Sequence, residues 1–413
     1  MAITHVRSRA DLVGLLSIAA EVEHSLMCQY LFAAFSLKHG VDEGLTEAQL
    51  VRVEHWEKKI LAVARQEMEH LGLVANLLTA IGAAPVLSRP AFPYSTTLYG
   101  HAMELTPFSL ATVERFVCFE KPAVGGDPML CPSPPAPDRF PNSVMVLWES
   151  IRAGFLGLAD EADLFLVGAD HQLGGGTLGT DFPRVGSLGG GYDVFMSTVT
   201  DLTSALAAID LVIEQGEAAR VQGEEGHFVA FLSVYDELAT MQAADPAFQP
   251  ARAVVATPVT TPNAGGTLLT DPLAVEVADL FDRAYQTMLL FLVRLLMSTD
   301  EGAEESGALA TVAFFPMMTM AIRPLAEILT AMPAAAPDDG TRAGPPFTVG
   351  SAGGFLPHRV AAWTVLIDEL TGLASEAARV AALPGAPTRL AYVAETLSLV
   401  ARRFIAEIAG GTP

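Results

Sequence analysis

Residues 53–81 have the sequence VEHWEKKILAVARQEMEHLGLVANLLTAI. The apolar residues recur at alternating steps of three and four, which places them on one face of an α-helix. We call this apolar face the seam of the helix. Glu67 and His70 lie on the seam, where an apolar side chain would pack without a desolvation cost. The pattern therefore predicts a long helix whose buried face carries two polar side chains that need a partner.

A helix expected over Arg9–Lys38 has the same feature. Its seam runs through Leu12, Leu16, Ala19, Glu23, Leu26, Tyr30 and Ala34. Glu23 occupies a position where leucine would be usual. A Glu on one helix that faces a Glu-x-x-His on the next is half of a site that holds two metals inside a helical bundle, because residues three apart point the same way.

A second half of the site is expected in a helix over Thr198–Thr240. There Glu224 and His227 repeat the Glu-x-x-His spacing, and Glu217 lies one heptad earlier on the same face if the helix is continuous. Carboxylates and imidazoles suit iron or manganese, whereas a zinc ribbon would need cysteines. A buried hydrogen-bonded network without metal stays open as an alternative. The predicted ligands are Glu23, Glu67, His70, Glu217, Glu224 and His227.

Charge and composition exclude several classes of protein. The chain has 24 Lys plus Arg against 47 Asp plus Glu, a net charge of −23, so a nucleic-acid partner is not expected. Its three cysteines show no C-x-x-C spacing, which favours a reducing compartment and hence a cytoplasmic protein. The apolar stretch 306–322 has 17 residues and contains Pro316, too short a run for a membrane span.

The fold class expected is all-α, because helical periodicity dominates and strand-like alternation is almost absent. We expect a four-helix bundle over residues 1–244, with a long crossover and with Pro-rich and Gly-rich insertions that could act as lids. A Pro/Thr-rich linker over 245–272 and a C-terminal helical domain over 273–413 follow. The expected helices are Arg9–Lys38, Thr46–Ile81, Ser109–Glu120, Asn142–Leu166, Thr198–Thr240, Leu273–Ser298, Glu305–Ala331 and two after Pro357.

Three motifs carry a family resemblance. Residues 21–31 (EVEHSLMCQYL), 64–78 (ARQEMEHLGLVANLL) and 213–217 (IEQGE) resemble the ferritin-like family of iminophenyl-pyruvate dimer synthase type, which includes a domain of violacein-pathway enzymes. Residues 107–109, 116–122 and 343–347 also look like its patterns.

The resemblance implies a non-haem di-iron bundle in which Glu23, Glu67, His70, Glu217 and His227 are ligands. One departure concerns the third bundle helix, where the family often has Ile-Gly-Glu and this chain has Val-Met-Val at 144–146. Glu149, one turn further on, is the nearest acid in that helix, and either it or Glu214 could replace one of the predicted ligands.

The resemblance further implies an O2-dependent oxidase or oxygenase that acts on a small, amino-acid-derived molecule in natural-product biosynthesis. Two iron ions per chain are expected, with manganese as an alternative. Its partners would be O2 and the small-molecule substrate, with no membrane and with a homodimer left open. The alternatives are an iron-handling protein without an organic substrate and a metal-free pathway scaffold.

Overall fold

The computed structural model describes residues 6–96, 102–122, 144–160, 163–174, 176–178, 194–217, 220–221, 224–263, 265–297, 300–350 and 358–410. The chain forms two compact units. Unit 1 contains Met1–Arg89, Pro93–Gly176 and Met196–Arg252, and unit 2 contains Pro90–Phe92, Thr177–Phe195 and Ala253–Pro413. The described residues are mainly helical, so the all-α expectation is confirmed.

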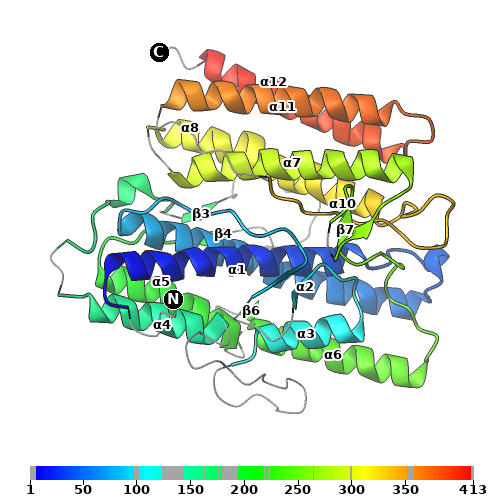
Figure 1. The fold of residues 1–413 in the computed structure, drawn as a ribbon, viewed down its shortest axis with the longest axis horizontal. Coiled ribbons are helices and arrows are strands. Elements are labelled where there is room, and N and C mark those ends of the chain that lie inside the picture. The colour runs from blue at the N-terminus through cyan, green and yellow to red at the C-terminus, as the bar shows by residue number, and fades with distance from the viewer. Residues whose placement is uncertain are drawn as a thin grey trace. The chain divides into compact units, whose positions relative to one another are not determined.

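Two long helices form one side of unit 1. Helices α1 (Arg9–Phe35) and α2 (Glu47–Ala80) pack against each other along their length (Figure 1). Ser8 accepts a hydrogen bond from the backbone N–H of Asp11 and so caps α1. Thr46 and Gln49 form a reciprocal capping box at the start of α2. These caps explain why both helices begin within a residue of the predicted positions.

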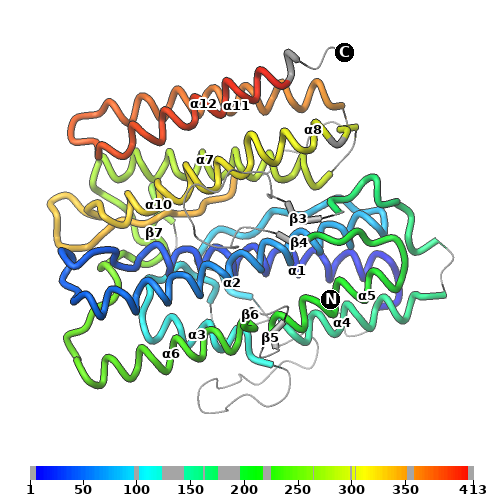
Figure 2. The backbone as a smooth tube through the Cα atoms, turned by 180° about the vertical axis from the view of Figure 1, so that it is seen from behind, coloured from blue at the N-terminus to red at the C-terminus, as the bar shows by residue number. Residues whose placement is uncertain are grey.

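The other side of the bundle is built from four shorter helices. They are α3 (Leu110–Phe119), α4 (Val144–Gly157), α5 (Leu202–Glu217) and α6 (His227–Ala244). Helix α3 packs on α6, α4 packs on α5 and α1, and α2 contacts both α5 and α6. Figure 2 shows α5 and α6 following one another along the bundle, with β5 and β6 between them. The helix ends on this side therefore meet near the middle of the bundle.

The prediction of one helix over Thr198–Thr240 is wrong. Helix α5 ends at Glu217, and an antiparallel pair of short strands, β5 (Arg220–Val221) and β6 (Glu224–Glu225), precedes α6. Glycine costs about 1 kcal/mol in a helix interior. Gly216 lies at the end of α5 and Gly226 is the N-cap of α6, so the chain leaves and re-enters the helical conformation at glycines.

Short elements complete unit 1 and its borders. Asn76 on α2 is buried and donates hydrogen bonds to the carbonyls of Leu173 and Ser197 at 2.6 and 2.9 Å, while its Oδ1 accepts from the Leu173 N–H at 3.2 Å. It thereby ties two loop segments to α2. The remaining short elements are η1 (Val41–Glu43), η2 (Ala169–His171), β1 (Tyr94–Ser95), β2 (Ala102–Met103), β3 (Gly176–Leu178) and β4 (Val194–Met196).

Unit 2 is a second helical body. Arg294 on its first long helix is fully buried and pairs with Asp300 and Glu301 at 2.6 and 2.5 Å. Residues Glu304–Leu329 are long and apolar enough to cross a membrane by composition, and 67% of their most apolar window is buried inside the protein. The elements are β7 (Pro258–Val259), β8 (Thr267–Leu268), α7 (Pro272–Met297), α8 (Ala303–Ala308), π-helical Leu309–Phe314, α9 (Phe315–Met317), π-helical Met318–Ile322, α10 (Arg323–Leu329), α11 (Arg359–Ala381) and α12 (Arg389–Gly410).

The cysteines differ from the expectation. Cys28 is a buried free thiol, but Cys118 is disulfide-bonded. A disulfide is unusual in a reducing compartment. The cysteines therefore do not support a reducing compartment, and the cytoplasmic location stays a prediction.

We expect Asn76→Ala to lower the free energy of unfolding by on the order of 2 to 4 kcal/mol, because it leaves buried backbone groups at Leu173 and Ser197 without their partner. Urea unfolding followed by circular dichroism measures this loss. Thr46→Ala is the control, since removing an exposed cap costs about 1 kcal/mol. A loss no greater than that of the control would contradict the role given to Asn76.

Candidate metal centre

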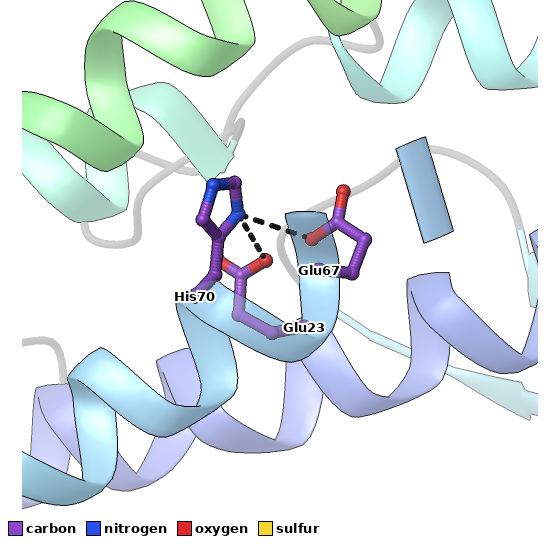
Figure 3. A group of neighbouring side chains, drawn as sticks. All are labelled: Glu23, Glu67 and His70. Carbon is purple, nitrogen blue, oxygen red and sulfur yellow. Dashed lines mark hydrogen bonds and ion pairs between the residues drawn. The ribbon is translucent and has the colours of Figure 1, made fainter. Parts of the chain in front are cut away.

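Three buried side chains from two helices meet in the bundle of unit 1. Glu23 of α1 lies against Glu67 and His70 of α2 (Figure 3). The His70 Nδ1 is 3.4 Å from Glu23 Oε2 and 3.3 Å from Glu67 Oε2. Each of the three residues is at most 2% exposed. The three-residue spacing in α2 therefore turns Glu67 and His70 toward the same point on α1, as the seam pattern predicted.

The other oxygen of Glu67 belongs to a second group. The His227 Nδ1 lies 3.1 Å from Glu67 Oε1 and 3.4 Å from Glu120 Oε2. His227 is the first residue of α6, and Glu120 follows the last residue of α3 as its C-cap. The two groups, Glu23–Glu67–His70 and Glu67–Glu120–His227, share Glu67 and are all buried.

Each outer carboxylate also has a buried hydrogen-bond donor. The Trp148 indole N–H donates to Glu23 Oε1 at 2.8 Å, and the Tyr30 hydroxyl donates to Glu120 Oε1. Trp148 and Tyr30 are both fully buried. One oxygen of each outer carboxylate is thus held by a donor, and the other faces a histidine. The sequence pattern placed Tyr30 only on the seam of its helix, and the structure gives it this direct contact with the site.

The structure brings together four of the six predicted ligands, namely Glu23, Glu67, His70 and His227. Glu217 is the last residue of α5, and Glu224 lies in β6 opposite Val221. Glu224 and His227 therefore do not share a helix face, and the helical spacing used to pair them is absent. The side chains of Glu217 and Glu224 lie outside the described residues.

Neither of the two alternative acids joins the site. Glu149 on α4 and Glu214 on α5 are both exposed to solvent, whereas the groups around Glu67 are buried. Trp148, the neighbour of Glu149 on α4, contacts the site through its indole N–H.

Sequence reasoning missed Glu120, although a signal was present. Val113, Phe116 and Val117 form the apolar face of α3 and are buried, and Glu120 continues that face one turn further. The rule that singled out Glu23 and Glu67, an acid at a seam position, would have found it. Glu120 was the last residue of the predicted helix. It was not singled out because no histidine stands within a few residues of it in the sequence.

The donor set fits a pair of metal ions. In each group, one carboxylate oxygen or imidazole nitrogen per residue lies within 4.8 Å of the others. Three buried acids without compensation would be costly, and cations placed among them would offset that cost. Oxygen and imidazole donors without thiolate suit iron or manganese.

Without a metal, protons on the histidines and on Glu23 compensate the buried charges, and a bound metal would displace protons from this site. Burial raises the pKa of Glu23 to about 8, and the charge of Glu67 adds to the rise. Burial opposes charge on His227, but Glu120 and Glu67 raise its pKa to about 9. Burial likewise opposes charge on His70, yet hydrogen bonds with Glu23 and Glu67 raise its pKa well above the usual value. Without a metal, both histidines therefore carry a proton on Nδ1 near neutral pH.

Glu67 behaves in the opposite way. Burial by itself would raise its pKa, but the hydrogen bond with Glu23 and the charge of His227 lower it well below the usual value. Glu67 therefore stays ionised between two imidazolium rings, while Glu23 holds a proton. In this way the protein's own protons compensate the buried charge of the shared carboxylate.

We expect divalent metal binding to release at least two protons per chain near pH 7, because His70 and His227 must lose their Nδ1 protons. Protons compete with the metal below the raised pKa values, so the apparent affinity should rise with pH until about 9, the pKa of His227. Calorimetric Zn²⁺ titrations in two buffers of different ionisation enthalpy count the protons. An affinity that stays constant between pH 7 and pH 9 would contradict this charge assignment.

Known proteins resemble this chain in sequence. A profile of the Ferritin-like family matches residues 16–236. A dichlorochromopyrrolate synthase from Lentzea aerocolonigenes is 30% identical over 445 residues, covering 98% of this chain and 42% of the relative. A 2-imino-3-(indol-3-yl)propanoate dimerase from Chromobacterium violaceum is 26% identical over 377 residues, covering 83% of this chain and 34% of the relative.

This chain thus spans less than half the length of these two relatives. Among solved structures, a ferritin-like protein from Caulobacter vibrioides has 20% sequence identity and a TM-score of 0.46, over 76% of this chain and 93% of that one. The family profile covers more than half of the chain and includes the helices that carry the site. The chain therefore belongs to the ferritin-like family, as its motifs predicted.

Proposed function

We propose that this protein is an O2-dependent di-iron enzyme that oxidises a small organic molecule in natural-product biosynthesis. The observation that carries the proposal is the pair of buried groups that share Glu67. Glu23 and His70 would hold one ion, Glu120 and His227 the other, and Glu67 would bridge them. When bound, such a pair supplies the electrons that reduce O2 and the oxidising power for the substrate.

The surrounding residues limit how the carboxylates can bind. Trp148 and Tyr30 each occupy one oxygen of Glu23 and Glu120, so each of these acids has one oxygen to offer an ion. With its outer carboxylate, the shared Glu67 and one histidine, each ion would receive three protein donors from the described residues. The pocket beside these donors would let small molecules approach the ions, as an enzyme requires.

A small pocket opens beside the carboxylates, and the substrate would approach the site through it. It reaches Glu23, Glu67, His70, Glu120 and His227. The apolar part of its wall would orient an apolar group of the substrate and exclude water from the reacting atoms. That part consists of Leu26, Phe119, Val144, Met145, Trp148 and Val212.

Lys121 also lines this pocket, directly after the ligand candidate Glu120. One curated relative is named a dichlorochromopyrrolate synthase and the other a 2-imino-3-(indol-3-yl)propanoate dimerase, and the second name contains an indole and a propanoate. We propose that the substrate here has an apolar body and a carboxylate that pairs with the Lys121 ammonium. A charge-assisted hydrogen bond of this kind is worth about 1.5 to 3 kcal/mol when shielded from water.

The runner-up function is iron handling without an organic substrate. The same carboxylates could bind and oxidise iron. Storage does not require unit 2, however, and the largest segment of that unit is Ala253–Pro413. A metal-free scaffold is the third option, and it would leave the shared Glu67 without a chemical role.

We expect the protein, reconstituted anaerobically with Fe²⁺, to hold about two irons per chain, and Glu67→Ala to lose both, because Glu67 contributes an oxygen to each group. Metal analysis after desalting measures the stoichiometry, and an O2 pulse should then produce a near-ultraviolet or visible charge-transfer band. Glu149→Ala, which changes an exposed acid on α4, is the matched control and should keep both irons.

Other iron contents would decide between the alternatives. Many irons per chain would support iron handling, and no specific iron would support the scaffold. Equal iron binding by Glu67→Ala and the wild type would refute a bridging role for this residue.

We expect Lys121→Met to weaken binding of indole-3-propanoate about tenfold or more, because it removes the charge that pairs with the carboxylate. Fluorescence or calorimetric titration of the metal-loaded protein measures the dissociation constant. The corresponding neutral amide should bind both proteins alike, and Lys58→Met, which changes an exposed lysine on α2, should have no effect. Equal binding of the acid by the wild type and Lys121→Met would remove Lys121 from the substrate site.

A further inference from the structure

The two histidines of the metal centre have the same pattern of contacts on their far side. Each directs Nδ1 at carboxylates and Nε2 at a side-chain amide. The His70 Nε2 lies 2.8 Å from Gln215 Oε1, and the His227 Nε2 lies 3.0 Å from Gln66 Oε1. In Figure 3 the second ring nitrogen of His70 points away from both carboxylates. Both glutamines are at most 4% exposed, so water does not replace these contacts readily.

These contacts determine which ring nitrogen keeps its proton when the imidazolium ring becomes neutral. An amide oxygen only accepts hydrogen bonds, and a neutral imidazole has one donor and one acceptor nitrogen. When Nε2 donates to the glutamine, Nδ1 must present its lone pair to the space between the carboxylates. This is the form in which histidine binds a metal through Nδ1.

Nε2 can donate to the amide only if the amide oxygen, rather than the amide nitrogen, faces the ring. For Gln215 its other partner settles this. The Gln215 Nε2 donates to Glu69 Oε2 at 3.3 Å, and a carboxylate can only accept, so the oxygen of the amide is left for His70. Glu69 is itself held by Arg65, whose Nη1 is 3.2 Å from Glu69 Oε1. Arg65 and Glu69 are both buried.

We propose that Gln215, oriented by the Glu69–Arg65 pair, and Gln66 are positioning residues that hold His70 and His227 with Nδ1 toward the two metal positions. The contacts of both glutamines used here are with the Nε2 atoms, on the far side of each ring from the Nδ1 that faces the carboxylates. They come from different helices, α5 and α2, and each serves one half of the centre. The contribution of each glutamine is thus separable from that of the other.

The proposal rests on the proposed metal centre, and its first test uses metal affinity. Co²⁺ titration of the metal-free protein, followed by visible absorption, gives two stepwise affinities. We expect Gln215→Leu to weaken one of the two ions about 10- to 100-fold and to leave the other within about threefold. Gln66→Leu should weaken one ion in the same way, and the double variant should weaken both. Glu214→Gln, an exposed neighbour on α5, is the matched control.

The second test does not require a metal. In the wild type, each Nε2–H is buried and donates to an amide, so ¹H–¹⁵N spectra should show two slowly exchanging histidine Nε2–H signals. Gln215→Leu should remove or shift the His70 signal alone, and Gln66→Leu the His227 signal alone. A merely structural role of the glutamines would change stability without this selective loss.

The outcomes separate the two proposals. A wild-type protein with both Nε2–H signals but no Co²⁺ binding would refute the metal centre and keep the hydrogen-bond assignment. Two bound Co²⁺ ions whose affinities stay within about threefold in both glutamine variants would overturn the positioning role. The two variants test it independently, so one that fails to fold leaves the other half of the centre as the test.

Discussion

The bundle depends on one buried carboxylate that serves two histidines. Glu67 directs one oxygen at His70 and the other at His227, and none of the three is more than 2% exposed. A single buried charge in this position would be strongly destabilising, so positive charge has to be supplied, either by the two imidazolium protons or by cations. The stability of the bundle therefore depends on the protons or cations that compensate the charge of Glu67.

The side of the bundle that is built from shorter helices supplies the second group of the site. Glu120 is the C-cap of α3, and His227 is the first residue of α6, so two of the five clustered residues come from helix ends. Continuous helices would have to present these residues from a helix face. The glycines that interrupt the segment between α5 and α6 cost helical stability, but they let the chain turn where the site needs a histidine.

Around the shared Glu67, each of the four outer groups of the candidate metal centre is held by a further buried residue. Trp148 and Tyr30 hold the outer carboxylates, and Gln215 and Gln66 hold the histidines. The arrangement is nearly symmetric in its contacts but not in its chemistry. An indole N–H can only donate a hydrogen bond, whereas a phenol can also accept one or release a proton. The two halves of the candidate metal centre therefore have different surroundings, and two ions bound there would have different properties.

The sequence by itself determined the helices and much of the site. The three-and-four periodicity is a local property of the chain, so it located α1 and α2 and marked Glu23, Glu67 and His70 as polar residues on buried faces. His227 was found by its spacing from Glu224, although the two do not share a helix. Motif similarity identified the family, which the matching profile confirms.

Only the tertiary structure decided which distant residues complete the site. Glu120 and its histidine partner, His227, lie on different helices, and the donors Trp148 and Tyr30 reach the carboxylates from two others. Periodicity states which residues are buried but not which of them meet, because contacts between helices depend on how the whole bundle packs. The break between α5 and α6 was missed because helical periodicity is present on both sides of it, although Gly216 and Gly226 mark where the chain leaves and re-enters the helix.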